Sequence, residues 1–302
     1  MIGLMLAVSI LAQAAERVPK TMTDAERMND KVLAAREYDK NARAVLSPRF
    51  REALDRASGF PPLRATWGEF ITVDGVPFIA LQLALPAATE GGRLILFGVI
   101  RSVDGKQIAS YNEPIAPQTS KDDTFVERSL IVPLQKCTGV FGLSRRNEII
   151  GMTGVEFDPE RLLPAAAGVS RLIVSRDVHR LHAAQRPLDP FAFGGTKVVP
   201  RPGAVFDRAE EMWIFAEVRN PAIGEDGVPH VVTKVTLEGP SKISGPAAPA
   251  ETTPLKGMPG RFGIGNPIDI SRLAPGDYTL RVVFTDLVAK RSFARETQIH
   301  IH

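Results

Sequence analysis

LAPGDYTLRVVFTD, residues Leu273–Asp286, is the stretch that decides the fold. Tyr278, Leu280, Val282 and Phe284 fall on one face of an extended chain, and the residues between them, mostly polar, fall on the other. A period of two with one apolar face predicts a strand that lies on a core. The Pro-Gly-Asp cluster just before the alternation predicts the turn that starts the strand. This pattern is typical of a β-sandwich.

Composition limits the class of protein. The chain has 302 residues, enough for two domains, and 44% of them are hydrophobic, which predicts folded cores rather than disorder. The net charge is +3 and no long run of Lys or Arg occurs, so nucleic acid is not an expected partner. Cys137 is the single cysteine, which excludes an intrachain disulfide. We expect it to be a small core residue; an intermolecular bridge or a reactive thiol are the alternatives.

The N-terminus predicts export. Residues 1–14 read MIGLMLAVSILAQA, an apolar run followed by the small residues that a signal peptidase prefers before Ala15. No Lys or Arg precedes the run, so an upstream start or a short membrane anchor are alternatives, although the run is too short for a standard span. We expect a cleaved signal peptide, a periplasmic or secreted protein, and no membrane span after its removal.

A helical segment is expected over residues 15–60. Thr23 or Asp24 caps a first helix, and Ser47 followed by Pro48 caps a second one that ends before Gly59. From residue 61 the apolar period changes to two, and a first β-sandwich is expected over 61–181. Its predicted strands are 65–73, 76–85, 93–102, 108–115, 124–133, 140–145, 148–157 and 170–177, with hairpin turns at Asp74-Gly75 and Asp104-Gly105.

A polar segment with two prolines, residues 182–190, is the predicted linker to a second β-sandwich over 191–302. The strands expected in this second domain are 196–200, 211–219, 230–238, 261–264, 277–286 and 291–301. Residues 241–260 are rich in Pro, Gly, Ala and Thr and are predicted to be a long connection without secondary structure. The predicted fold is therefore mostly β, with two Ig-like sandwiches behind a short helical segment.

Three blocks carry a resemblance to a known family. They are RLILFGVIRSVDGKQ at 93–107, LDPFAFGGTKVVP at 188–200 and LAPGDYTLRVVF at 273–284. The chain from about residue 66 to 302 resembles the C-terminal sandwich modules of the secreted VWFA-related and GWxTD-type proteins of acidobacteria. It has neither the Asp-x-Ser-x-Ser metal motif nor the Gly-Trp-x-Thr-Asp motif; Trp67 stands in ATWGE. The resemblance therefore implies sandwich modules and carries over no metal site or catalytic residue.

The histidines do not predict a metal site. His179 and His182 have helical ligand spacing, but a strand through this segment would point them to opposite sides, so linker or surface histidines are expected. His300 and His302 share a strand face at the chain end, where a weak metal site is the alternative to a frayed terminus. We predict no metal ligands and no cofactor.

Motifs for other chemistry are also missing from the sequence. It has no Gly-x-Ser-x-Gly elbow, no Ser-x-x-Lys box and no His-Glu-x-x-His. The carboxylate pairs Asp122-Asp123 and Glu210-Glu211 are predicted to be exposed loop acids. The segment Gly263–Gly265 lacks the third glycine and the helix of a phosphate loop and is predicted to be a turn. No catalytic residue is assigned.

Two pairs of aromatic residues invite a structural or a binding interpretation. Trp213 and Phe215 are expected to join the Tyr278 strand in one inner cluster of the second sandwich, with partner or glycan contact as the alternative. Phe191 and Phe193 follow the linker and are expected to fill the junction between domains; a docking patch is the alternative.

The functional hypothesis is an exported, non-catalytic protein that presents sandwich surfaces to a protein partner in the cell envelope or outside the cell. The alternative is a hydrolase or carbohydrate-active enzyme on a sandwich scaffold, which would need close carboxylates in a cleft. A third hypothesis is a truncated or accessory part of a larger VWFA-related protein.

Overall fold

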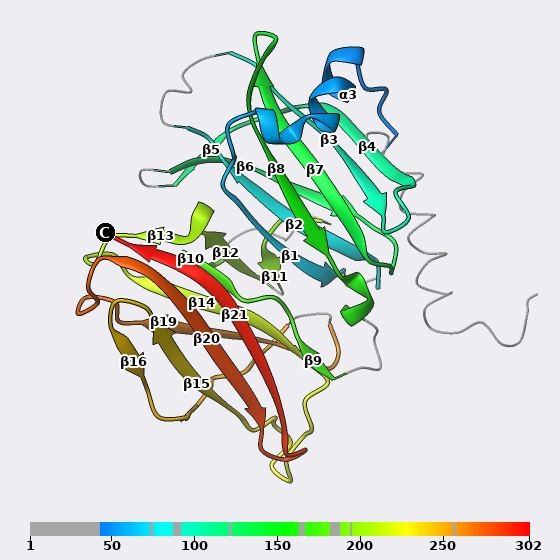
Figure 1. Cartoon of the computed structure of the whole chain (residues 1–302). Coiled ribbons are helices and arrows are strands. Elements are labelled where there is room, and N and C mark those ends of the chain that lie inside the picture. Colours follow the sequence, from blue (N-terminus) through cyan, green and yellow to red (C-terminus); the bar gives the residue numbers. More distant parts are fainter. Residues whose placement is uncertain are drawn as a thin grey trace, which may run out of the picture.

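Four mainly antiparallel sheets form two β-sandwiches that lie one above the other (Figure 1). The computed structural model describes residues 43–72, 75–86, 92–120, 123–162, 167–181, 188–193, 195–255 and 258–302. The predicted signal peptide, the first predicted helix, Asp74 and most of the predicted linker lie outside the described residues. The mostly-β architecture with a helix ahead of it is confirmed.

The first sandwich is built from four hairpins. One sheet has the order β1-β2-β6-β5 and the other β4-β3-β7-β8, so successive hairpins alternate between the sheets. The predicted Asp104-Gly105 turn is confirmed between β3 and β4, where Gly105 has a φ of 82°. The strands are β1 Ala65–Ile71, β2 Pro77–Ala84, β3 Leu94–Ser102, β4 Gln107–Ile115, β5 Gln118–Ser120, β6 Asp123–Ile131, β7 Cys137–Arg145 and β8 Glu148–Phe157.

The segment before β1 crosses the outer face of the β4-β3-β7-β8 sheet. Its helix α3, Pro48–Asp55, is capped as predicted, because the Ser47 side chain accepts a hydrogen bond from the Phe50 backbone N–H. The Phe50 ring stacks on Phe97 of β3 with 4.2 Å between centroids. The short 3₁₀ turn η1 (Ala57–Gly59) follows, and Leu63 then donates a backbone hydrogen bond to Met152 of β8. The helix therefore covers a sheet face that would otherwise be exposed.

The second sandwich has an immunoglobulin-like arrangement. Its first sheet has the order β11-β12-β10-β14-β19-β18 with β9 paired to β14, and its second has the order β13-β21-β20-β15-β16 with β17 paired to β15. The strands are β9 Gly168–Val169, β10 Ile173–Arg180, β11 Ala192–Phe193, β12 Thr196–Pro200, β13 Val205–Phe206, β14 Met212–Arg219, β15 Val231–Glu238, β16 Lys242–Ser244, β17 Ala248–Pro249, β18 Thr253–Pro254, β19 Arg261–Ile268, β20 Gly276–Asp286 and β21 Arg291–Ile301. Two 3₁₀ turns, η2 (Pro159–Leu162) and η3 (Pro202–Ala204), complete the elements.

Three predictions about this region need correction. The strand expected to close the first sandwich is β10, and it pairs with β12 and β14 of the second, because its apolar side chains complete that sheet. The segment 241–260 contains the short strands β16, β17 and β18, which pair with β15 and β19 and so satisfy its backbone groups. Gly263 and Gly265 lie inside the continuous strand β19 and not in a turn.

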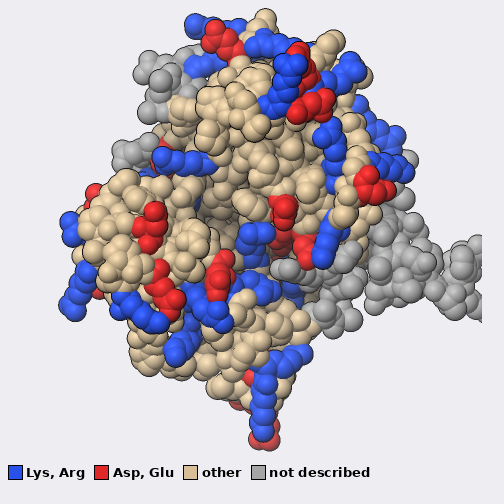
Figure 2. Space-filling view, in the orientation of Figure 1, with Lys and Arg blue, Asp and Glu red and all other residues tan. Residues whose placement is uncertain are grey.

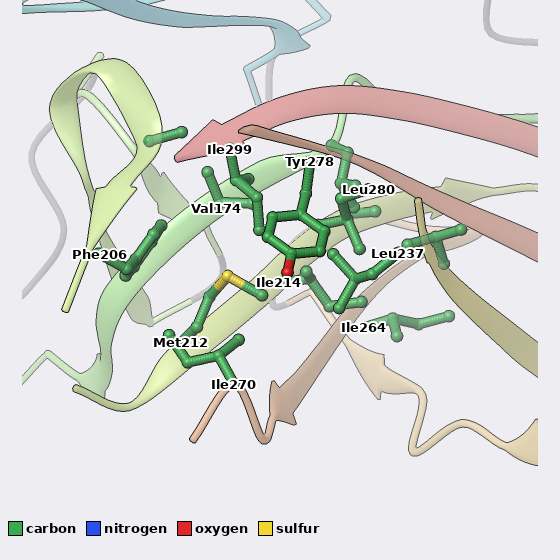
Figure 3. Close-up of a cluster of buried hydrophobic side chains, with 14 of the residues drawn as sticks. Val174, Phe206, Met212, Ile214, Leu237, Ile264, Ile270, Tyr278, Leu280 and Ile299 are labelled. Carbon is green, nitrogen blue, oxygen red and sulfur yellow. The ribbon is translucent and has the colours of Figure 1, made fainter. Parts of the chain in front are cut away.

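The core of the second sandwich surrounds the Tyr278 strand (Figure 3). Tyr278, Leu280, Val282 and Phe284 are all buried in it, as the alternation predicted. The Tyr278 hydroxyl donates to the carbonyl of Ala274, four residues upstream, at 2.8 Å, and lies 2.9 Å from the Ser241 hydroxyl. This return bond is the tyrosine corner of immunoglobulin-like sandwiches and fixes the turn before β20.

The seam is the second buried layer, where β1 and β2 of the first sandwich pack against β10, β12 and β14 of the second. Phe193 lies at its centre, 4.3 Å from the Phe70 ring and 4.9 Å from the Phe215 ring. Phe191 is also fully buried there, so the expected role of this phenylalanine pair at the junction is confirmed. Phe215 thus belongs to the seam and not to the Tyr278 core, and the half-buried Trp213 lies on the same face of β14. The prediction of one cluster was wrong because Met212 and Ile214 take the inward positions.

Candidate interaction surface at the loop end of the second sandwich

The loop end of the second sandwich brings two connections together (Figure 1). One is the loop between β14 and β15, residues 220–230, and the other is the turn between β20 and β21, residues 287–290. The Leu287 backbone N–H donates to the His230 carbonyl at 2.9 Å, which joins the two connections directly. In an immunoglobulin-like sandwich these correspond to the B–C and F–G loops, which lie at one end of the domain.

Asp286 holds the two connections in place. Its carboxylate accepts hydrogen bonds from the backbone N–H of Ala222 and of Ala289, both at 2.9 Å, and forms an ion pair with Arg291 at 3.2 Å. Burial raises the pKa of Asp286, but the bonds from Ala289, Ala222 and Arg291 together outweigh burial, so the net pKa is lowered. A lowered folded pKa means that Asp286 stabilises the fold above the ordinary Asp value near 3.9, and that this stabilisation is lost as the pH falls through the folded value.

Each connection has its own internal support. In the first, Ile223 bridges to Pro229, and the Gly224 N–H donates to the Val228 carbonyl at 2.8 Å. Asp226 closes this small hairpin, because its carboxylate lies 3.0 Å from the His230 ring nitrogen; this hydrogen bond lowers the pKa of Asp226. Backbone and side-chain bonds thus define the loop conformation without burying its apolar residues.

Four large apolar side chains are exposed on these connections. Ile223 is 51% exposed, Val228 49%, Leu287 52% and Val288 42%. We call these four residues the tip surface. Apolar side chains in turn positions do not stabilise the fold, and an exposed apolar cluster with a polar rim is typical of a protein contact site. The tip surface therefore has the composition expected of a docking site.

Outside the tip surface, Ile243 of β16, at 39%, is the one other large apolar side chain that is exposed in the described part of the second sandwich. The outward faces of β20 and β21 carry cross-strand polar pairs such as Arg281 with Glu296 and Thr285 with Ser292. Figure 2 shows Lys and Arg interspersed with Asp and Glu over the described part of one face of the molecule, without a large area of one sign. This distribution favours a contact through apolar packing over one through a charged patch.

The residues singled out for chemistry lie apart from the tip surface. His179 pairs with Asp177 at 2.9 Å, His300 lies 2.6 Å from Asp277, and His182 lies outside the described residues. The rings of His300 and His302 are 4.7 Å apart. Within the described ranges no group of three or more His, Cys, Asp or Glu residues is placed to hold a metal ion. Cys137 is buried in the core of the first sandwich, as predicted.

The predicted loop acids have structural partners. Asp123 accepts from Arg201 at 2.6 Å and pairs with Arg176 at 3.1 Å, and Glu210 pairs with the same two arginines. Asp123 belongs to the first sandwich and the other three residues to the second, so this network lies across the seam. The interpretation of Asp123 and Glu210 as exposed loop acids was wrong, because both neutralise the buried Arg176; Asp122 lies outside the described residues and Glu211 is exposed.

Comparison with known proteins adds little to this description. No protein-family model matches the chain, and no curated protein does. Among solved structures, red sea bream transglutaminase matches at 15% identity over 83% of this chain, with a TM-score of 0.24. The match spans 33% of the transglutaminase chain. A TM-score this low carries no argument about fold or function.

Proposed function

We propose that this is an exported, non-catalytic protein that binds a protein partner in the cell envelope or outside the cell through the tip surface. The observation that carries the proposal is the exposure of Ile223, Val228, Leu287 and Val288 on two connections that are bonded to each other and held by the buried Asp286. A preformed apolar surface loses little conformational entropy when it binds, which favours affinity.

Two further parts of the proposal come from the sequence. The apolar run at residues 1–14 supports export, and the block LAPGDYTLRVVF supports a relationship to the sandwich modules of VWFA-related secreted proteins. In the described part of the chain, no helix has the length and apolar character to cross a bilayer. N-terminal sequencing of the protein from the periplasmic or extracellular fraction tests export; we expect mature chains that begin near Ala15.

The partner contact is tested by site-specific photo-crosslinking in the source cell. A photoreactive residue at position 287 should give a discrete crosslinked species, and the same residue at position 45 should give none. Val45 is the matched control because it is an exposed apolar residue, 86% exposed, on the first sandwich. The crosslinked protein, once identified and purified, should bind the wild-type chain and lose at least tenfold in affinity with Leu287→Asp. Equal affinity for wild type and Leu287→Asp would exclude the tip surface.

The alternative function, a hydrolase on a sandwich scaffold, has one supporting observation. The carboxylates Glu69, Glu156 and Asp158 of the first sandwich line a groove of about 810 Å³ between the two sandwiches. Acid–base hydrolysis requires such groups in a cleft. Turnover of a chromogenic glycoside or ester that is abolished by Glu69→Gln, with folding retained, would favour this alternative over the binding function.

A further inference from the structure

The groove between the sandwiches is lined by a buried arginine with unsatisfied hydrogen-bond donors. Arg219, at the end of β14, lines the groove, and its side chain is only 4% exposed. Its Nε and Nη1 atoms have no hydrogen-bond partner. Buried polar groups in proteins are almost always hydrogen-bonded, and an unpaired buried charge is costly, so this exception requires an explanation.

The nearest carboxylate is already engaged. Glu217 Oε1 lies 3.9 Å from Arg219 Nε, but the same carboxylate accepts two hydrogen bonds from Arg261, one of them at 3.0 Å from the Arg261 Nε. Arg261 also donates to the Ile71 carbonyl at 2.6 Å and so ties Glu217 to the first sandwich. Glu217 is therefore shared between two arginines: it accepts hydrogen bonds from Arg261 and lies too far from Arg219 to accept one from it.

Other cations surround the same space. Arg295 of β21 donates hydrogen bonds to the carbonyls of Val169 and Ser170, which hold its guanidinium beside the groove. Arg171 lies over the Trp67 ring at 4.6 Å and is 3.7 Å from Glu69. The second sandwich thus contributes three arginines, Arg171, Arg219 and Arg295, and one carboxylate, that of Glu296, to the described lining, so positive charge predominates on its wall.

The electrostatic balance at Arg219 agrees with this geometry. Burial lowers the pKa of the Arg219 guanidinium; Glu217 and Glu69 oppose this effect, while Arg261 and Arg295 add to it. An anion at the two unpaired nitrogens would satisfy them and offset the repulsion among the three guanidinium groups.

We propose that this groove binds a small organic anion whose carboxylate or phosphate oxygens accept hydrogen bonds from Arg219. The volume of about 810 Å³ is in the range of small-molecule sites, which favours a free small molecule over an extended polymer. Arg171 and Arg295 contribute charge at the same wall. The proposal does not depend on the tip surface, which lies at the loop end of the second sandwich.

Thermal unfolding of the full chain tests the proposal. Chloride is replaced stepwise at constant ionic strength by inorganic phosphate in one series and by citrate in another. At an anion concentration ten times its Kd we expect Tm to rise by about 4 °C, with saturation. Arg219→Met should abolish this rise. Arg49→Met, which removes an exposed arginine of α3, should keep it. A response to phosphate alone or citrate alone identifies which oxyanion the site prefers, and either supports the site.

The behaviour of Arg219→Met without added anion is a second criterion. Because the variant removes a buried charge with unsatisfied donors and keeps most of the side-chain length, its Tm in chloride should equal or exceed that of the wild type. If Arg219→Met does not fold, anion binding is measured instead by the fluorescence of Trp67 in the Trp213→Phe variant. Trp67 packs under Arg171, which lines the groove. A saturable signal with the midpoint of the Tm series supports the site. Absence of saturation with both anions, or an unchanged Tm rise in Arg219→Met, overturns it.

Discussion

The core of the second sandwich and the seam between the sandwiches are both buried, but different side chains fill them. The core around Tyr278 is made of aliphatic and aromatic residues. The seam has aromatic residues at its centre and buried ion pairs around them, including Glu127 with Lys197 at 2.8 Å and the network of Arg176. The difference indicates two origins. The core forms from strands whose apolar residues alternate with polar ones, whereas the seam forms where a sheet is buried on both of its faces.

Strand β2 shows how this happens. Ile79 and Leu81 point into the first core, while Phe78 and Ala80 on the other face point into the seam. Gln82 follows on the seam face and donates to Glu127 at 3.1 Å. In the sequence, a polar residue on such a strand suggests a solvent-facing position, yet Gln82 is buried. It is bonded to Glu127 of the adjacent strand β6, which pairs in turn with Lys197 across the seam.

The largest effect is expected in the core. Tyr278→Ala should lower the free energy of unfolding by about 4 kcal/mol, because it removes a fully buried ring and two hydrogen bonds. Tyr278→Phe keeps the ring and should cost about 1 kcal/mol, the value of the lost hydroxyl bonds. Urea denaturation measures both. A cost for the Ala variant close to that of the Phe variant would show that the ring contributes little to this core.

The second effect concerns an ion pair of the seam. Lys197→Met should cost about 3 kcal/mol at pH 7, because it leaves the Glu127 carboxylate buried without its cation. Burial raises the pKa of Glu127, and Lys197 opposes that rise. A raised folded pKa means that the folded chain takes up a proton more readily than the unfolded chain as the pH falls. The destabilisation by Lys197→Met should therefore be smaller at pH 5 than at pH 7; a cost independent of pH would contradict the role of Glu127.

The same contrast explains how far the sequence predicts the fold. Alternation located nearly all of the longer strands, and three of them, Glu148–Phe157, Thr196–Pro200 and Arg291–Ile301, have the predicted bounds. Alternation does not say which sheet a strand joins, so β10 was assigned to the wrong sandwich. Alternation also does not identify which face of an all-apolar strand points into the core of its own sandwich, so the predicted cluster for Phe215 is wrong.

The candidate sites were less accessible from the sequence. The tip surface has a weak signal, since Leu287 and Val288 are apolar residues directly after a strand, at a turn where polar residues are usual. The groove has no sequence signal that the spacing of residues along the chain could reveal. Arg171, Arg219 and Arg295 are far apart in the chain and meet only because β9 pairs with β14 and β21 packs beside it.

A smaller effect is expected at the centre of the seam. Phe193→Leu keeps apolar volume but removes the ring contacts with Phe70 and Phe215, and should cost about 1.5 kcal/mol. Because these contacts join the two sandwiches, the variant should also separate their unfolding into two transitions by calorimetry. Val198→Ala, a truncation elsewhere in the seam, serves as the control for loss of volume alone. A single sharp transition in Phe193→Leu would show that the ion pairs suffice to couple the sandwiches.

The smallest effect tests the two faces of β14 directly. Trp213 is half-buried on the seam side of this strand, beyond the aromatic centre, whereas its neighbour Ile214 is buried in the core. Trp213→Ala should therefore cost less than about 1 kcal/mol, although tryptophan is the larger side chain, and Ile214→Ala should cost about 3 kcal/mol. The test is which of the two variants loses more free energy of unfolding, because a shift of β14 by one residue would exchange the faces of Trp213 and Ile214 and reverse that order. A greater loss for Trp213→Ala in urea denaturation would place the tryptophan in the core, as its alternation with Phe215 first suggested, and would assign Ile214 to the seam.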